Sequence, residues 1–138
     1  MIVTRNVRLQ TMGDSDIIDI TREVEPALVE SKLNAGTVTV FVTHSTAGIT
    51  VIENESGLIR DFKELWERIA PRSIKYNHDA GIGEGNGHAH VRASLLGASL
   101  VVPFSEGRLL LGTWQQIVLI DFDNRPRSRT IVLQFMGD

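Results

Sequence analysis

The chain contains no cysteine among its 138 residues. This absence excludes a disulfide framework and a thiolate metal site, so any metal ion must be held by imidazole and oxygen ligands. A basic excess is missing too, because 14 lysines and arginines stand against 17 aspartates and glutamates, a formal net charge of -3. Proteins that bind the nucleic-acid backbone usually carry a basic surplus, so nucleic acid is not the expected partner.

Long apolar runs are absent as well. No stretch approaches the roughly 20 residues that a membrane-spanning helix needs, and the first ten residues lack the uninterrupted apolar core of a secretory signal. We therefore expect a cytoplasmic protein that binds no membrane. The length and the ordinary composition, 42% hydrophobic and 22% charged, predict a single domain over residues 1–138 with its own core.

Several familiar signatures are also missing. The glycines between Gly81 and Gly87 alternate with other residues, but their spacing matches neither GxGxxG nor GxxxxGK[ST], which argues against a nucleotide-binding fold. No GxSxG motif occurs. His44 and Ser45 are adjacent, and neighbouring residues of a strand point to opposite faces, so His44 is not expected to activate Ser45 as a nucleophile.

The hydrophobic periodicity predicts an α+β fold. Helical spacing of apolar residues indicates three helices, from residue 21 to about 35, from 56 to 70 and from 89 to 96. Turn signals predict two hairpins, one joining 99–104 to 108–111 and one joining 115–122 to 130–135. We therefore expect a mixed or antiparallel, sandwich-like β core with about three helices. The remaining strands are predicted at 2–10, 17–20, 37–43 and 49–53.

The densest group of chemically active side chains lies between Asn77 and Leu96. His78, His88 and His90 bracket the glycine-rich loop, and His44 ends the most convincing strand. Neutral imidazole is the commonest nitrogen ligand of zinc, and three such ligands leave an open catalytic position. We expect all four histidines to share one pocket as ligands of a divalent metal, zinc or magnesium. The alternative is that they have no joint role.

The irregular segment 71–87 is long for a compact domain and carries His78 and Asp79, which favours a functional loop. A glycine loop that leads into a helix offers backbone N–H groups to an anion, although a merely flexible loop fits the same residues. On a helix that begins near Ala89, His90 and Ser94 share a face.

One carboxylate at the end of a predicted strand has two interpretations. Asp121 shares strand parity with Ile117 and Leu119. It is either solvent-exposed at the strand end or buried with a partner such as Arg127 or Arg129.

Three stretches together resemble the YjbQ-like family, also called the secondary thiamine-phosphate synthase family. They are HSTAGITVIEN at 44–54, HAHVRASLLGASLVVPFSEGRLLLGTWQ at 88–115 and PRSRTIVLQFMG at 126–137. The resemblance implies an α+β sandwich that assembles as a homotrimer, with a pocket at or near the subunit interfaces. It also implies a transferase that joins a pyrimidine methyl pyrophosphate to a thiazole phosphate and releases pyrophosphate.

The resemblance and the residue chemistry together predict the site residues. A helix N-terminus, loop amides and Arg92 would hold pyrophosphate, while His90 or His44 would move a proton. From the residues alone, Asn54 is expected to cap the helix after it, and Trp114 is expected in the core. The expected catalytic residues are His44, Glu53, His90 and Ser94. The expected substrate-binding residues are Ser45, Thr46, Asn54, Asp79, Asn86, Arg92, Trp114 and Gln115.

Two other functions fit the same residues. One is a metal-dependent hydrolase of phosphorylated small molecules, with the histidines around an open metal position. The other is a non-catalytic, trimeric binding module. Metal content and turnover of phosphoesters would favour the hydrolase, whereas tight ligand retention without turnover would favour the binding module. In each case the expected partner is a phosphorylated small molecule.

Overall fold

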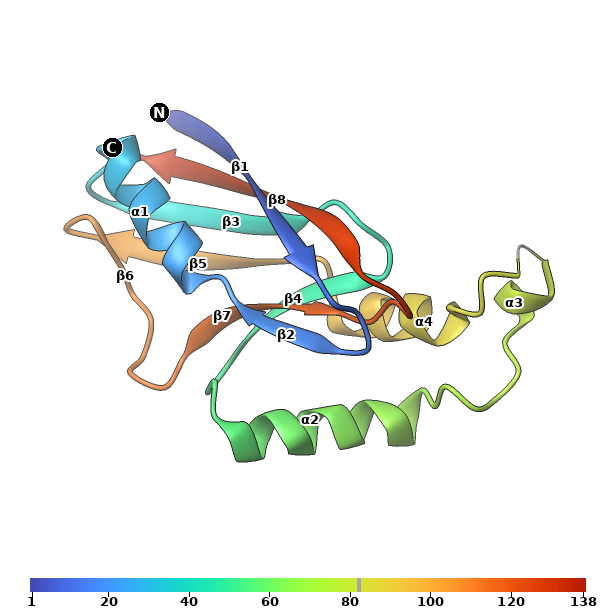
Figure 1. Ribbon diagram of the computed structural model, residues 1–138. Helices are drawn as coiled ribbons and strands as arrows, with labels where there is room; N and C mark the ends of the chain where they lie inside the picture. Colours follow the sequence, from blue (N-terminus) through green and yellow to red (C-terminus); the bar gives the residue numbers. More distant parts are fainter. Residues whose placement is uncertain (82) are drawn as a thin grey trace.

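The computed structural model describes residues 1–81 and 83–138, which form two antiparallel sheets and four helices (Figure 1). The expected α+β class with a sandwich-like β core is confirmed, with one helix more than expected. The strands are β1 (Ile2–Thr11), β2 (Asp16–Asp19), β3 (Gly36–Val42), β4 (Ala47–Ile52), β5 (Ser99–Ser105), β6 (Arg108–Leu109), β7 (Gln116–Asp121) and β8 (Arg127–Gly137). The helices are α1 (Thr21–Ser31), α2 (Ser56–Ile69), α3 (Asn77–Gly81) and α4 (Gly87–Leu96).

The two sheets enclose the main core between their inner faces. One sheet has the strand order β1-β8-β3-β5-β6 and the other has the order β2-β7-β4. In the larger sheet Val38 lies opposite Val102 and Phe135, and all three side chains are buried. This register follows from the two-residue alternation of apolar side chains, which turns every second residue inward. Residues of α1, such as Val24 and Leu28, join the same cluster.

The predicted hairpin between 115–122 and 130–135 is wrong, because β7 and β8 belong to different sheets. The segment between them carries the chain from the small sheet to the large one. Its turn residues were recognisable from the sequence, but a turn signal is local and does not specify the partner of the next strand. The other predicted hairpin is confirmed, since Ser105 pairs with Arg108 across Glu106 and Gly107.

Helix α1 begins at Thr21 as expected but ends at Ser31, because Lys32 adopts a left-handed conformation with φ 61°. Pro26 lies inside the helix on an exposed position. Proline has no backbone N–H, so α1 lacks one internal hydrogen bond there rather than starting later.

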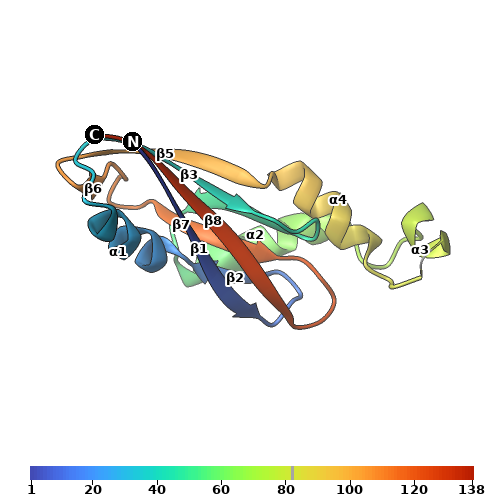
Figure 2. The same cartoon turned by 90° about the horizontal axis from the view of Figure 1, so that it is seen from above.

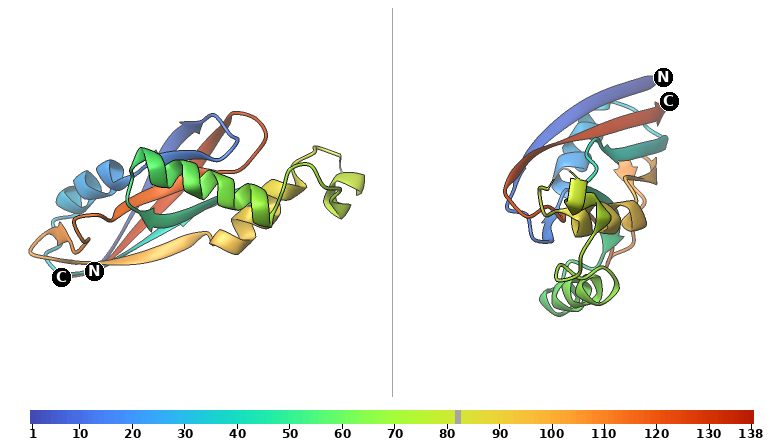
Figure 3. Two further views of the ribbon diagram at one scale, coloured as in Figure 1. Left: turned by 90° about the horizontal axis from the view of Figure 1, so that it is seen from below. Right: turned by 90° about the vertical axis from the view of Figure 1, so that its right-hand side faces the viewer.

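Helix α2 runs along the outer face of the small sheet (Figure 3). Its Trp66 is the only buried residue of the helix and packs edge-on against Phe122, with ring centroids 4.9 Å apart. The helix is capped by Glu55, whose carboxylate accepts the N–H groups of Gly57 and Leu58 at 2.6 and 3.0 Å. The expectation that Asn54 provides this cap is therefore wrong.

The two ends of the elongated molecule differ in character. The N- and C-termini lie together at one end, where the Met1 amino group donates to the Gly137 carbonyl at 2.9 Å (Figure 2). Helix α4 lies at the other end, next to the turns that follow β3 and β7, and α3 lies beyond it at the tip. None of the helices in 1–81 and 83–138 is long and apolar enough to cross a membrane.

Candidate functional site

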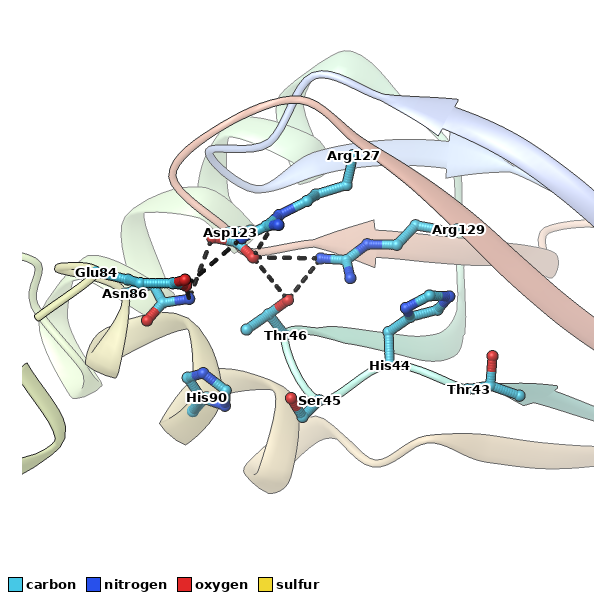
Figure 4. A pocket seen from close by; sticks show the side chains of 10 residues that line it. All are labelled: Thr43, His44, Ser45, Thr46, Glu84, Asn86, His90, Asp123, Arg127 and Arg129. Carbon is cyan, nitrogen blue, oxygen red and sulfur yellow. Dashed lines mark hydrogen bonds and ion pairs between the residues drawn. The ribbon is translucent and has the colours of Figure 1, made fainter. Parts of the chain in front are cut away.

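A polar pocket of about 310 Å³ opens where the turns after β3 and β7 meet the start of β8 and of α4 (Figure 4). Side chains from four separate parts of the chain converge there, as expected of a ligand site. This polar pocket is lined by Thr43, His44, Ser45, Thr46, Glu84, Asn86, His90, Asp123, Arg127 and Arg129.

A buried ion pair forms the inner wall of the polar pocket. Asp121 is fully buried, and its two carboxylate oxygens accept hydrogen bonds from Nε and Nη2 of Arg129 at 2.6 and 2.8 Å. The Thr11 hydroxyl donates to the same carboxylate, and Arg129 Nη2 also donates to Thr46 Oγ1. A bidentate contact of this kind fixes the plane of the guanidinium group. Of the two interpretations of Asp121, the buried pair with Arg129 is correct.

Asp123 is the second carboxylate of this wall. Burial opposes its ionisation, but hydrogen bonds from the Asn124 amide, the Thr46 hydroxyl and Arg127 together hold its pKa below the ordinary value. The Thr46 hydroxyl donates at 2.9 Å and Arg127 Nε at 3.0 Å. Asp123 is therefore an anion at neutral pH whose oxygens are occupied by its own donors.

His44 is held in one tautomer by the backbone of β8. Its Nε2 accepts the N–H of Thr130 at 2.9 Å, so Nε2 carries the lone pair and Nδ1 carries the proton. Burial, followed by the positive charge of Arg129, lowers the pKa of His44 from its ordinary value. The imidazole is therefore a neutral hydrogen-bond donor on the wall of the polar pocket.

His90 is the second imidazole of the polar pocket, and His78 stacks against it from α3 with ring centroids 4.4 Å apart. Burial and the neighbouring His78 lower the pKa of His90. A neutral imidazole with a lowered pKa can accept a proton near neutral pH. His78 does not line the polar pocket, and its Nδ1 lies 3.5 Å from Asp79 Oδ1.

His88 lies on the opposite side of α4, because residues two apart on a helix point in different directions. It is 3% exposed, and burial followed by the charge of Arg92 lowers its pKa. Arg92 donates hydrogen bonds there to the Ala70 carbonyl, to the Ser15 hydroxyl and to the Glu67 carboxylate, at 3.0, 3.2 and 2.8 Å. The structure thus does not support the expected role of Arg92 in holding pyrophosphate, since its donors join α4 to α2 and to the β1–β2 turn.

The expected four-histidine metal site is not formed. Within residues 1–81 and 83–138, no three histidine, aspartate or glutamate side chains are grouped as metal ligands. His88 lies outside the polar pocket and His44 Nε2 is occupied by Thr130, so the donor set does not fit the predicted ion.

Three of the predicted substrate-binding residues do line the polar pocket: Ser45, Thr46 and Asn86. Asp79 does not, because it accepts the Gly87 N–H at 2.9 Å and so occupies the first amide of α4. This contact also removes that amide from the set expected to hold an anion.

Ser94 does not line the polar pocket, but it lines a neighbouring hollow of about 260 Å³ together with His44 and Ser45, and another together with His90. Its hydroxyl donates to the His90 carbonyl at 2.7 Å, one helical turn earlier. The expected catalytic role of Ser94 stays a prediction.

The other predicted residues lie away from the polar pocket. Glu53 and Asn54 follow the far end of β4, and the Asn54 N–H donates to Gln116 Oε1 at 2.8 Å. Trp114 is 71% exposed on the β6–β7 loop, so its expected place in the core is wrong. Gln115 stabilises that loop, where its Oε1 accepts the Gly112 N–H at 2.8 Å.

The sequence contained a signal for residues that were not predicted as site residues. Asp121 and Asp123 precede a turn at a spacing of two, and Arg127 and Arg129 follow it at the same spacing. Residues two apart on a strand point to the same face, so a pair of aspartates before the turn and a pair of arginines after it indicate a network of ion pairs. Thr43 and Glu84 carry no comparable signal.

Sequence comparison decides the family. The pattern described as "UPF0047 protein YjbQ-like" matches residues 5–138. The chain belongs to the YjbQ-like family. This YjbQ-like protein is 41% identical to a UPF0047 protein of Archaeoglobus fulgidus over 126 residues, which covers 91% of this chain and 95% of that protein. It is 38% identical to the UPF0047 protein YugU of Bacillus subtilis over 140 residues, covering 96% and 98% of the two chains.

Solved structures agree with this assignment. A YbjQ-like protein of unknown function from Sulfolobus solfataricus P2 superposes with a TM-score of 0.94 at 33% identity, over 100% of this chain and 99% of that one. A hypothetical protein from Aeropyrum pernix K1 superposes with a TM-score of 0.91 at 32% identity, over 99% of both chains. The resemblance to the YjbQ-like family inferred from the motifs is confirmed, whereas none of these relatives is described as a thiamine-phosphate synthase.

Proposed function

We propose that this YjbQ-like protein is a transferase that acts on phosphorylated small molecules in the polar pocket. The proposed reaction is that of a thiamine-phosphate synthase, which transfers a pyrimidine methyl group from its pyrophosphate to a thiazole phosphate. The supporting observation is that Arg127, Arg129 and the neutral donor His44 line one pocket together with the base candidate His90.

The chemistry of this reaction matches those groups. The bond between the pyrimidine methyl carbon and the pyrophosphate oxygen breaks, and its electron pair leaves on pyrophosphate. A carbon–nitrogen bond then forms to the thiazole ring nitrogen, which becomes positively charged. Fixed donors that face the departing oxygens stabilise the charge that develops on them, and this is usually the largest catalytic contribution. Arg127 and Arg129 supply such donors. The neutral His90 would take a proton from the amino group of the pyrimidine as the pyrophosphate leaves, and would return it once the carbon–nitrogen bond has formed.

No step of this mechanism passes through a metal ion, because the histidines do not present a fitting donor set. The residues of the site position its donors: Asp121 orients Arg129, Asp123 orients Arg127, and the Thr46 hydroxyl links Arg129 to Asp123.

The proposal is tested by incubating the protein with the pyrimidine pyrophosphate and the thiazole phosphate. Thiamine phosphate is measured after oxidation to its fluorescent thiochrome, and released pyrophosphate is measured in parallel. We expect product from the wild type and a rate lower by about 10²–10³ in Arg127→Met, the loss typical of removing one such donor. Arg5→Met, on an exposed position of β1, is the matched control. Wild-type protein that forms neither product would refute the transferase.

We also propose that the protein assembles as a homotrimer. The outer face of the five-stranded sheet supports an association surface, because Ile2, Phe41, Val101 and Met136 are 60%, 41%, 59% and 51% exposed there. An exposed apolar face of this kind is typical of a surface between subunits.

A further inference from the structure

We infer that the polar pocket contains a preorganised subsite for one tetrahedral phosphate group, formed by Arg129 Nη1 and His44 Nδ1–H. The inference deepens the proposed function, on which it rests, by naming the atoms that hold a phosphate group of the substrate. The ligand class is a phosphate oxyanion, carried by a monoester, by pyrophosphate or by inorganic phosphate.

The first donor is fixed by the buried ion pair. Asp121 occupies Nε and Nη2 of Arg129, and Thr46 also accepts from Nη2. Nη1 makes no hydrogen bond to any residue in the described part of the chain, although the guanidinium group lines the polar pocket. In the view of Figure 4 one terminal nitrogen meets Thr46 and Asp123, and the other lies on the side of His44. Because the side chain is only 5% exposed and cannot swing away, Nη1 is presented to a ligand without reorganisation.

The second donor is fixed by the backbone of β8. Thr130 N–H occupies His44 Nε2, so the proton of the neutral ring stays on Nδ1. The ring lines the same pocket wall as Arg129, and the Arg129 charge is a cause of the lowered pKa of His44. His44 thus serves as a neutral hydrogen-bond donor. This tautomer also explains why His44 fits neither the metal-ligand role nor the proton-shuttle role expected from the sequence.

A further donor of the polar pocket, outside this pair, is the hydroxyl of Ser45, which follows His44 in the turn between β3 and β4. Among residues 1–81 and 83–138 it has no hydrogen-bond partner, whereas the neighbouring Thr46 hydroxyl is taken by Asp123. In Figure 4 this hydroxyl is directed toward His90 rather than toward Arg129 and His44, so the two fixed N–H donors form the subsite and Ser45 is free to contact another part of the ligand.

The negative charges of the nearby carboxylates do not prevent a phosphate group from binding in this subsite. Asp121 is fully buried behind Arg129, and both of its oxygens are bonded to that side chain. Asp123 accepts from Thr46 and Arg127, so its lone pairs face its own donors. Glu84 is half exposed and lies 3.8 Å from Arg127 rather than beside Arg129. Directed N–H groups, not an excess of positive charge, therefore hold the anion.

The test measures phosphate binding directly and needs no turnover. Isothermal titration calorimetry at pH 7.5 with inorganic phosphate, pyrophosphate and glycerol 3-phosphate compares the three sources of the group. We expect saturable 1:1 binding that weakens about 10- to 100-fold in His44→Leu and in Arg129→Lys, the usual effect of losing one hydrogen bond to a charged group. Lysine keeps a buried positive charge for Asp121 but replaces three guanidinium nitrogens by one, so Nη1 is lost together with the bidentate contact. Arg72→Met, on an exposed arginine outside the polar pocket, is the control and should bind as the wild type does.

Two further measurements separate a donor role from a structural one. His44→Asn places an amide N–H close to the former Nδ1–H and should restore most of the affinity lost in His44→Leu. Long-range ¹H–¹⁵N NMR of the free protein should show His44 with its proton on Nδ1. A proton on Nε2, or phosphate binding that is unchanged in both His44→Leu and Arg129→Lys, overturns the subsite. Phosphate binding without thiamine-phosphate formation supports the subsite and removes only the transferase.

Discussion

At the scale of single residues, the buried Asp121–Arg129 pair determines the geometry of the polar pocket. A buried pair of this kind contributes little net stability when intact, since the cost of desolvating two charges offsets their attraction. Removing one partner is a different matter, because the other charge is left uncompensated in the interior. The pair therefore acts mainly as a positioning device, and its loss should affect both folding and ligand binding.

We expect Asp121→Ala to lower the free energy of unfolding by about 3–5 kcal/mol, the usual cost of leaving a buried charge without its partner. Urea unfolding followed by circular dichroism measures this loss. Asp61→Ala, on an exposed position of α2, is the control and should change stability by less than about 0.5 kcal/mol. A loss below about 1 kcal/mol in Asp121→Ala would show that Arg129 finds other partners.

His90 carries the second residue-scale prediction. Its neutral ring is expected to accept a proton, so His90→Ala should reduce the transfer rate by about 10²–10⁴ while the melting temperature stays near that of the wild type. Its pKa is lowered from the ordinary 6.5, and the neutral form is the active one. Wild-type activity should therefore stay constant as the pH falls to about 6.5 and decline only below it. An activity that already declines above pH 7 would exclude His90 as the base.

At the scale of elements, helix α4 serves two functions with opposite faces. One face brings His90 to the polar pocket, and the other buries His88 and Arg92 against α2. Gly87 is required at the start of this helix, because a Cβ there would lie 2.6 Å from the Tyr76 side chain. Sequence periodicity placed α4 within two residues of its observed start. It could not show which of the two histidines faces the ligand, because the helix has little amphipathic contrast and its partners come from distant parts of the chain.

The buried face of α4 makes stability depend on pH. The pKa of His88 is lowered in the folded state, so the unfolded chain binds more protons around and below the ordinary value of 6.5. The stability present above about pH 6.5 is therefore lost as the pH falls through the folded-state pKa. The lowered pKa values of His44 and His90 act in the same direction.

We expect His88→Leu to be more stable than the wild type, with a gap that widens from pH 7.5 to pH 5. Leucine fills the site without a charge to bury, and His88 Nε2 has no hydrogen-bond partner among the described residues. Urea unfolding at pH 5, 6 and 7.5 measures the gap. Parallel stability curves for the two proteins would mean that His88 does not contribute to the pH dependence.

At the scale of the whole molecule, the sequence predicted the α+β class and most element positions, because two- and 3.6-residue periodicities are local. It did not predict that β7 and β8 separate into two sheets, since pairing depends on long-range burial rather than on the turn between them. The same separation places Asp121, at the end of β7, against Arg129 of β8, behind the wall of the polar pocket. The sequence offered this ion pair as one interpretation of Asp121, but charge pairing alone does not show that the arginine also faces a ligand. Trp114 shows the converse error: an aromatic residue in an apolar run was expected in the core, yet its loop leaves it 71% exposed.

The exposed face of the large sheet leads to the last prediction. Val101 and Met136 both point outward from this sheet, in register with Thr39 and Thr37 of β3. If copies associate through this face, size-exclusion chromatography with light scattering should give three times the 15.3 kDa mass of the chain, and Val101→Glu should shift the protein toward monomer.

Val29→Glu is the matched control, because Val29 is 70% exposed but lies on α1, away from this face. A trimer unaffected by Val101→Glu but broken by Val29→Glu would move the interface to α1, and a monomeric wild type would remove the homotrimer. Since a glutamate in a subunit interface must be desolvated without a partner, the substitution at Val101 is expected to act on assembly while the fold of each chain is retained.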